Sequence, residues 1–164
     1  MGRIHKDLSA DVEKMDTLIK IHSSKAANFL VIKSLLHQEN ALKSDIQKLI
    51  ANQIQSPTFY PKQSGFKSML SNNELGAIQN IELRKSLIDL YESTYERLIY
   101  NGHIYDKIHI EKFNEYLMPY FDFGTNQLID IEGLKNSVFL NSLAYLNEVA
   151  KAYTQLLEQA KKRN

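Results

Sequence analysis

The feature that most constrains the fold is one long run of helical periodicity between Asn80 and Pro119. Apolar and aromatic side chains recur there at a spacing near 3.6 residues, which places them on one face of an α-helix. The recurring residues are Leu83, Leu87, Leu90, Tyr91, Leu98, Tyr105, Ile108, Phe113, Tyr116, Leu117 and Tyr120. An unbroken helix over residues 82–118 would be about 55 Å long at about 1.5 Å per residue. It cannot bury its apolar face alone, so the rest of the chain must pack against it.

One dipeptide leaves the continuity of this helix open. Asn101-Gly102 is a turn signal. The apolar phase is nevertheless the same on both sides, since Tyr105 lies two turns after Leu98. The sequence therefore fits a continuous or mildly kinked helix, and it also fits a break at Gly102.

Two further long helices are predicted, over residues 3–39 and 131–162. Apolar residues keep helical phase through both, and Asp130 is a suitable N-cap for the second. On the first helix we expect the charged residues to lie largely on the solvent-facing side. These are Asp11, Glu13, Lys14, Asp16, Lys20 and Lys33.

Two short helices are predicted between the first long helix and the central one, over residues 41–52 and 64–71. Two prolines interrupt the irregular stretch 53–63 that separates them. Asn73 is suited to the left-handed position that ends the second short helix, and Asn80 to the N-cap of the central helix. No alternating pattern predicts a β-strand, and Asp122-Phe123-Gly124 predicts a turn.

These elements define the fold class. The chain has 164 residues, which suits a single domain over residues 1–164. We predict an all-α protein, an antiparallel helical bundle of three long helices plus two short ones.

Several kinds of function are disfavoured by the sequence. There is no cysteine, so disulfides and thiolate metal sites are excluded, and a net charge of +1 argues against nucleic acid as a partner. No phosphate-binding loop, nucleophile elbow or Glu-x-x-His pair is present. We therefore predict no enzyme activity, no catalytic residues, no metal and no cofactor. His103, Asp106 and His109 are expected on a solvated face, and His22 in the core.

Tyrosines are concentrated in the central helix, where six of nine lie between Tyr91 and Tyr120. A buried tyrosine needs a partner for its hydroxyl group, so core packing near a wet end of the bundle is one explanation. A binding face or pocket is the other. The candidate binding residues are Tyr91, Tyr95, Tyr105, His109 and Tyr116.

The segment from Phe66 to Tyr91 carries a further pattern. It contains Leu-Ser before a short turn, then Leu, Ile and Asn, then Leu-Arg, Leu and Tyr at helical spacing. It resembles the central signature of a family of small Bacteroidetes membrane proteins of unknown function. Asn73 stands where that family has glycine. The signature residues are Leu70, Asn73, Ile78, Asn80, Leu83, Arg84 and Leu87.

The resemblance implies a location more than an activity. Members of that family have one N-terminal transmembrane helix, followed by a helical part outside the cytoplasm. We therefore expect either that residue 1 is not the native start or that this is a soluble relative. The function expected is a non-catalytic extracytoplasmic helical interaction or sensory module of a membrane-anchored protein, at the periplasmic face of a bacterial membrane. Its partner would be another protein or a second copy. The alternatives are a cytoplasmic location and a soluble bundle that binds an apolar or aromatic small molecule in a tyrosine-lined cavity.

Overall fold

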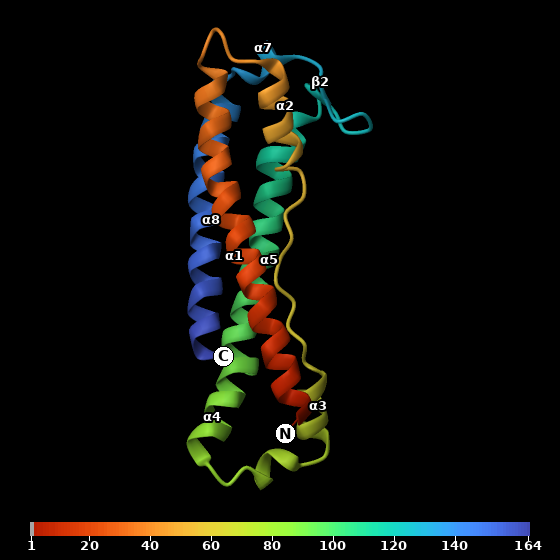
Figure 1. Cartoon of the computed structure of the whole chain (residues 1–164), viewed down its shortest axis with the longest axis vertical. Coiled ribbons are helices and arrows are strands. Elements are labelled where there is room, and N and C mark those ends of the chain that lie inside the picture. The colour runs from red at the N-terminus through yellow and green to blue at the C-terminus, as the bar shows by residue number, and fades with distance from the viewer. Residues whose placement is uncertain (1) are drawn as a thin grey trace.

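The computed structural model describes residues 2–164 and contains three long helical elements that run along one elongated bundle (Figure 1). The first is α1 (Gly2–Leu36) and the last is α8 (Ser137–Arg163). The central one comprises α4 (Ile81–Asp89), α5 (Tyr95–His109) and α6 (Glu115–Leu117), joined by π-helical turns at Leu90–Thr94 and Ile110–Asn114. The all-α prediction is confirmed.

The direction of the long helices follows from one extended connection. After α1 the chain turns into α2 (Lys43–Ala51), then returns along the whole bundle to α3 (Ser64–Ser71) beside the N-terminus (Figure 1). A 3₁₀ turn at Glu74–Ala77 leads into α4. The central element therefore runs in the same direction as α1, and α8 runs antiparallel to both.

The central helix is continuous through Gly102, which settles the question that the sequence left open. Gly102 is buried, and a Cβ atom there would lie 3.1 Å from the Tyr153 hydroxyl and 3.3 Å from the Cβ of Thr58. Glycine at this position allows close approach by a neighbouring segment and does not break the helix. The irregular positions are the two π-helical turns, which the apolar periodicity does not reveal.

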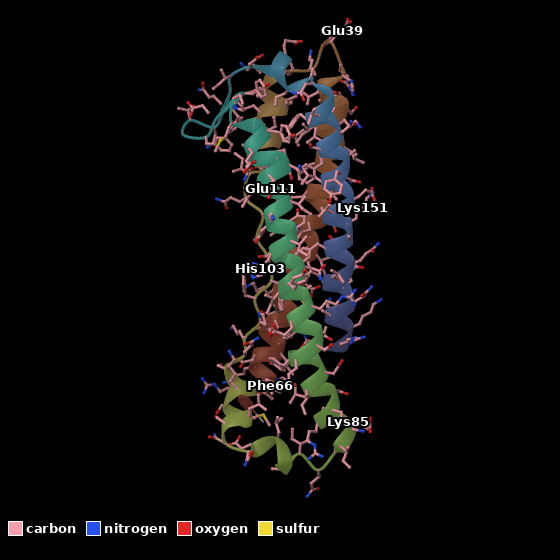
Figure 2. All side chains as sticks on the ribbon, turned by 180° about the vertical axis from the view of Figure 1, so that it is seen from behind. Glu39, Phe66, Lys85, His103, Glu111 and Lys151 are labelled. Atoms are coloured by element: carbon pink, nitrogen blue, oxygen red, sulfur yellow. The ribbon has the colours of Figure 1, made fainter. Side chains whose placement is uncertain are left out.

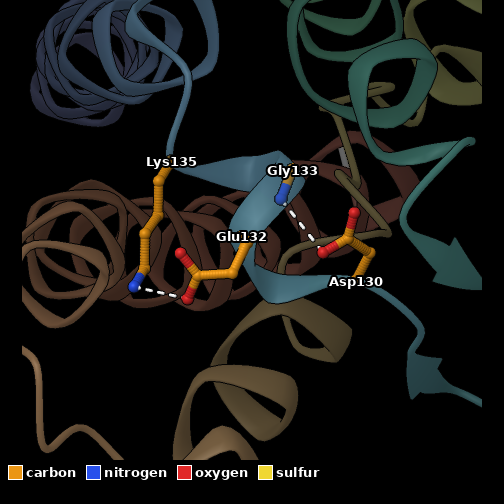
Figure 3. Close-up of polar contacts among 4 residues, drawn as sticks. All are labelled: Asp130, Glu132, Gly133 and Lys135. Carbon is orange, nitrogen blue, oxygen red and sulfur yellow. Dashed lines mark hydrogen bonds and ion pairs between the residues drawn. The ribbon is translucent and has the colours of Figure 1, made fainter.

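The prediction of one helix over residues 131–162 is wrong at its start. The structure has a short α7 (Ile131–Leu134) and then α8, with the chain leaving the helical path at Lys135. Asp130 caps α7 as predicted, accepting a hydrogen bond from the backbone N–H of Gly133 at 3.1 Å (Figure 3). Asn136 provides a second cap, accepting from Phe139 N–H at 2.9 Å. Two capping residues so close together start two helices.

The prediction that the chain contains no β-strand is also wrong, although the strands are very short. β1 (Phe121–Asp122) and β2 (Gln127–Leu128) form one short antiparallel pair at the far end of the bundle from the N-terminus. The predicted turn lies between them, where Asp122 Oδ1 accepts from Gly124 N–H at 2.8 Å. A pair of two-residue strands is too short to produce a recognisable alternation of residues.

The predicted turn and cap at the base of the bundle are confirmed. Asn73 has a left-handed backbone with φ of 55°. Asn80 caps α4, its side chain accepting from Leu83 N–H at 3.0 Å. No helix within residues 2–164 is both long enough and apolar enough to cross a membrane.

Candidate functional site

The connection between α2 and α3 is bound along its whole length by side chains of the long helices. We call residues 53–65 the strap; the last two of them begin α3. The strap is extended and lies beside α1, running in the opposite direction (Figure 1). Gln53 and Phe59 are fully buried, so the strap is part of the core.

Five ionisable side chains of α1 hold the main chain of the strap. The two acidic ones accept hydrogen bonds from backbone N–H groups, and the three basic ones bind carbonyl oxygens. The pairs are Asp7 with Gly65 N–H (2.8 Å), Asp11 with Lys62 N–H (2.9 Å), Lys14 with Tyr60 O (3.5 Å), His22 with Pro57 O (2.8 Å) and Lys25 with Gln53 O (2.8 Å). We call these five residues the ionisable stripe.

The stripe follows from helical geometry. Asp7, Asp11 and Lys14 are spaced three or four residues apart, and so are His22 and Lys25. This spacing places the side chains on one face of the helix. An extended segment has no main-chain partners of its own, and each buried N–H or C=O needs one. The ionisable side chains of α1 supply these partners. The expectation that Asp11 and Lys14 face solvent is therefore wrong for Asp11, which is 1% exposed; Lys14 is exposed, but it contacts the strap.

Burial changes the acidity of the stripe. It raises the pKa of Asp11, against the stabilising effect of the Lys62 N–H bond. Burial lowers the pKa of His22 to about 4 and that of the Lys25 ammonium group to about 8. Each shift disfavours the charged form, as expected when water is removed from an ionisable group.

The other long helices bind the strap from its opposite side. Asn114 donates to the carbonyl of Ile54 at 3.3 Å, and the Thr58 hydroxyl donates to Asp106 at 3.2 Å. Two tyrosines also take part: the Tyr153 hydroxyl accepts from Phe59 N–H at 3.0 Å, and the Tyr91 hydroxyl donates to Lys62 O at 3.3 Å. The strap therefore lies in a groove made by α1 and the central element, with α8 contributing at Phe59.

Several buried polar atoms beside the strap have no hydrogen-bond partner within residues 2–164. They include His22 Nδ1, both side-chain amide atoms of Gln53, His109 Nε2 and Asn114 Oδ1. The Pro57 carbonyl can only accept, so His22 must donate through Nε2. Its Nδ1 is then an unprotonated acceptor. Unpaired buried groups are uncommon in folded proteins, and they gather here.

His109 corrects a prediction. We expected it on a solvated face, but it is 1% exposed, with its ring packed against those of Phe29 and Phe113. Burial, with a further contribution from the Lys25 charge, lowers its pKa to about 3. His103 is exposed as expected, on the outside of α5 (Figure 2). Within residues 2–164 no three His, Asp or Glu side chains gather in a way that could hold a metal ion. The prediction that His22 lies in the core is confirmed.

The candidate tyrosines are spread along the bundle. Tyr91, Tyr95 and Tyr105 are buried, and Tyr116 is half-buried. The three buried rings pack on other rings: Tyr91 stacks on Phe66 at 4.3 Å and Tyr105 on Tyr153 at 5.3 Å between centroids, and Tyr95 contacts Tyr91. Tyr91 and Tyr116 reach two separate surface hollows. The structure therefore does not bring these residues into one pocket.

An apolar groove lies at the base of the bundle, beside the N-terminus of α1. It has a volume of about 350 Å³. Its lining residues are Gly2, Ile4, His5, Leu8, Met69, Ile78, Leu83 and Leu87. Leu83 is 50% exposed, and its neighbour Ile81 is 54% exposed.

The residues of the sequence signature meet at this base. Ile78, Leu83 and Leu87 line the groove. Asn73 and Asn80 shape the turn and the cap that bring α4 to it. The remaining two lie nearby on the same elements: Leu70 is exposed on α3, and Arg84 is half-buried on α4.

A family model matches residues 1–150, which covers α1, the strap, the central element and the first half of α8. The chain belongs to the DUF6090 family of unknown function. The region shared with DUF6090 contains both the ionisable stripe and the apolar groove. Comparisons with proteins of curated function and with solved structures gave no match.

Proposed function

We propose that the chain is a non-catalytic helical interaction module that associates with a second copy through the apolar groove at its base. The observation that carries this proposal is the groove itself, because its lining is almost wholly apolar and exposed apolar surfaces can mark sites of protein contact. The surface offers a hollow and, at its edge, the protruding side chains of Ile81 and Leu83. A twofold contact needs one patch that supplies both.

We further propose that the module is anchored to a bacterial membrane and lies on its periplasmic side, in a family of Bacteroidetes proteins with one membrane span. The support is the sequence resemblance. An anchor joined ahead of α1 would also bring the groove close to the bilayer, because Gly2 and Ile4 line it. The alternative is a cytoplasmic module. The gene sequence upstream tests this, since a membrane anchor requires an apolar run of about 20 residues.

A sensory role belongs to the same proposal. A module held at a membrane and joined to a partner through its base could report a change in its own conformation. The proposal that the protein is not an enzyme rests on the site chemistry: the ionisable side chains that come together are used to bind the strap.

One surface hollow lined by a candidate tyrosine still fits the alternative function, the binding of a small molecule. Tyr91 lines a hollow of about 270 Å³ together with Phe66 and Leu70. Native mass spectrometry of the purified protein tests it, because a co-purified apolar or aromatic compound would be retained. The other buried tyrosines pack against rings and offer such a ligand little space.

The test of self-association uses Leu83→Glu, which places a charge in the groove. Sedimentation velocity over a wide concentration range should show a dimer for the unchanged protein and a monomer for the variant. Leu30→Glu is the matched control, since Leu30 is also helical and 44% exposed but lies far from the groove, near the C-terminal end of α1. An unchanged protein that stays monomeric at every concentration, or a control that dissociates equally, would refute the proposed interface.

A further inference from the structure

The strap is surrounded by groups whose charge depends on pH. They come from each long helix that packs against it, and they are not confined to α1. The titratable groups facing the strap are Asp7, Asp11, Lys14, His22 and Lys25 on α1, Tyr91, Tyr95, His103, Tyr105, Asp106 and His109 on the central element, and Tyr153 on α8.

Acid acts on the two halves of the strap in different ways. In the half that ends at Gly65, the carboxylates of Asp7 and Asp11 accept main-chain N–H bonds. Burial raises the pKa of Asp11, so the closed strap favours the protonated form of this carboxyl group and acid does not release this half. In the half that begins at Gln53, protonation adds charge instead, because His22 and His109 are neutral rings beside the Lys25 ammonium group.

The added proton would have no acceptor in the core. His22 donates through Nε2 to Pro57, so a second proton must sit on Nδ1, which has no partner within residues 2–164. His109 Nε2 also has none. Charging either ring would bury an unpaired cation and an unpaired donor among aromatic side chains, which strongly disfavours the closed arrangement. The Asp106 carboxyl group does little to stabilise a positive charge on these rings. It accepts a hydrogen bond from Thr58, and its electrostatic interaction is with the exposed His103.

We propose that the first half of the strap is an acid-released latch: protonation of His22 and His109 frees residues 53–59 from α1 and the central element while α1 and α8 stay packed. The α1–α8 contact is the most extensive in the bundle and consists mainly of apolar side chains. Release would expose Phe59, whose buried ring packs on Tyr95 at 5.3 Å between centroids. This device goes beyond the proposed interaction at the base and does not depend on it.

Hydrogen exchange measured by mass spectrometry tests the latch in the unchanged chain. Protection factors, corrected for the intrinsic effect of pH on exchange, are compared at neutral pH and under mild acid. Amides of residues 53–59 should lose at least about tenfold more protection than α8 amides, since tenfold corresponds to one pKa unit of differential protonation. Equal losses in residues 53–59 and α8, or no loss in either, would overturn the proposal.

Variants separate the two halves of the strap. His22→Gln keeps a donor for the Pro57 carbonyl, and combined with His109→Gln it removes both titrating rings. The double variant should no longer lose protection in acid at residues 53–59, whereas residues 62–65 should stay protected in both proteins. His37→Gln, at an exposed position at the end of α1, should behave like the unchanged chain. A double variant whose residues 53–59 still lose protection in acid would show that the histidines do not operate the latch.

Discussion

The ammonium nitrogen of Lys25 lies 2.8 Å from the carbonyl oxygen of Gln53, inside the core, and it donates a hydrogen bond there. Lys25 is 4% exposed, and Gln53 is fully buried. A lysine so placed lacks the water that normally solvates its charge, and it binds a main-chain acceptor at the first residue of the strap. This hydrogen bond fixes the position of the first strap residue. It also makes the free energy of unfolding depend on pH in the alkaline range.

The first prediction concerns that dependence. The pKa of Lys25 is about 8 in the folded protein, below its ordinary value of 10.5. Between these two pH values the unfolded chain binds a proton that the folded one releases, so stability rises with pH. Urea unfolding should show a gain of about 1 kcal/mol from pH 7 to pH 9, below the range in which the tyrosines of the unfolded chain ionise. In Lys25→Met this gain should disappear, whereas Lys20→Met, at an exposed position, should retain it.

The second prediction concerns Gly102. A Cβ atom would lie 3.1 Å from the Tyr153 hydroxyl, which cannot retreat without weakening its bond to Phe59 N–H. Gly102→Ala should therefore destabilise the protein by about 1 kcal/mol, despite the better helix propensity of alanine. Thermal unfolding followed by circular dichroism measures the change. Gly76→Ala is the control, since its added Cβ would meet nothing within 4 Å; an equal loss there would contradict a steric cause.

The third prediction concerns the start of α8. Asn136 accepts from Phe139 N–H and donates to the carbonyl of Gly133 at 2.7 Å, so it both caps α8 and holds α7 to it. Asn136→Ala should lower the free energy of unfolding by about 1 kcal/mol. Asn141→Ala, an exposed position within the same helix, should be neutral or slightly stabilising. Similar losses for both variants would argue against a capping role.

The fourth prediction concerns the other end of the strap. Asp7 accepts from Gly65 N–H at 2.8 Å and from the Ser64 hydroxyl at 3.2 Å, so a residue of α1 caps the start of α3. Asp7→Ala leaves that backbone N–H unpaired in the core and should cost about 2 kcal/mol. The measurement is denaturant unfolding at neutral pH. Glu13→Ala, at an exposed site on the same helix, should change stability very little, and a comparable loss there would refute the assignment.

The long helices could be predicted because their signal is local. Helical phase in the sequence gives the spans of α1 and of the central element, and Asn73, Asn80 and Asp130 mark turns and caps through short-range hydrogen bonds. The π-helical turns leave the apolar phase almost unchanged, so they could not be seen. The break before α8 had a visible signal in Asn136, a second capping residue soon after Asp130.

The strap could not be predicted, because its partners lie far away in sequence. A charged residue on a helix normally faces water, so Asp11 was expected there. What buries it is the main chain of a distant segment, whose direction no periodicity reveals. One signal was present: the ionisable residues of α1 recur at helical spacing on one side, next to a connection with two prolines. His109 was misplaced for a related reason, since its burial depends on Phe29 of another helix.

The stripe and the strap also imply an order of folding. Lys25 and His22 bond to residues 28 and 35 positions further along the chain, whereas the bond from Asn147 to the carbonyl of Ala26 spans 121. Contacts close in sequence cost less chain entropy to form, so α1, α2 and the strap can assemble first as a hairpin-like unit. The central element then closes over the strap, and α8 docks last. A chain interrupted before α8 would retain this early unit, with the α8-binding face of α1 exposed and prone to aggregation.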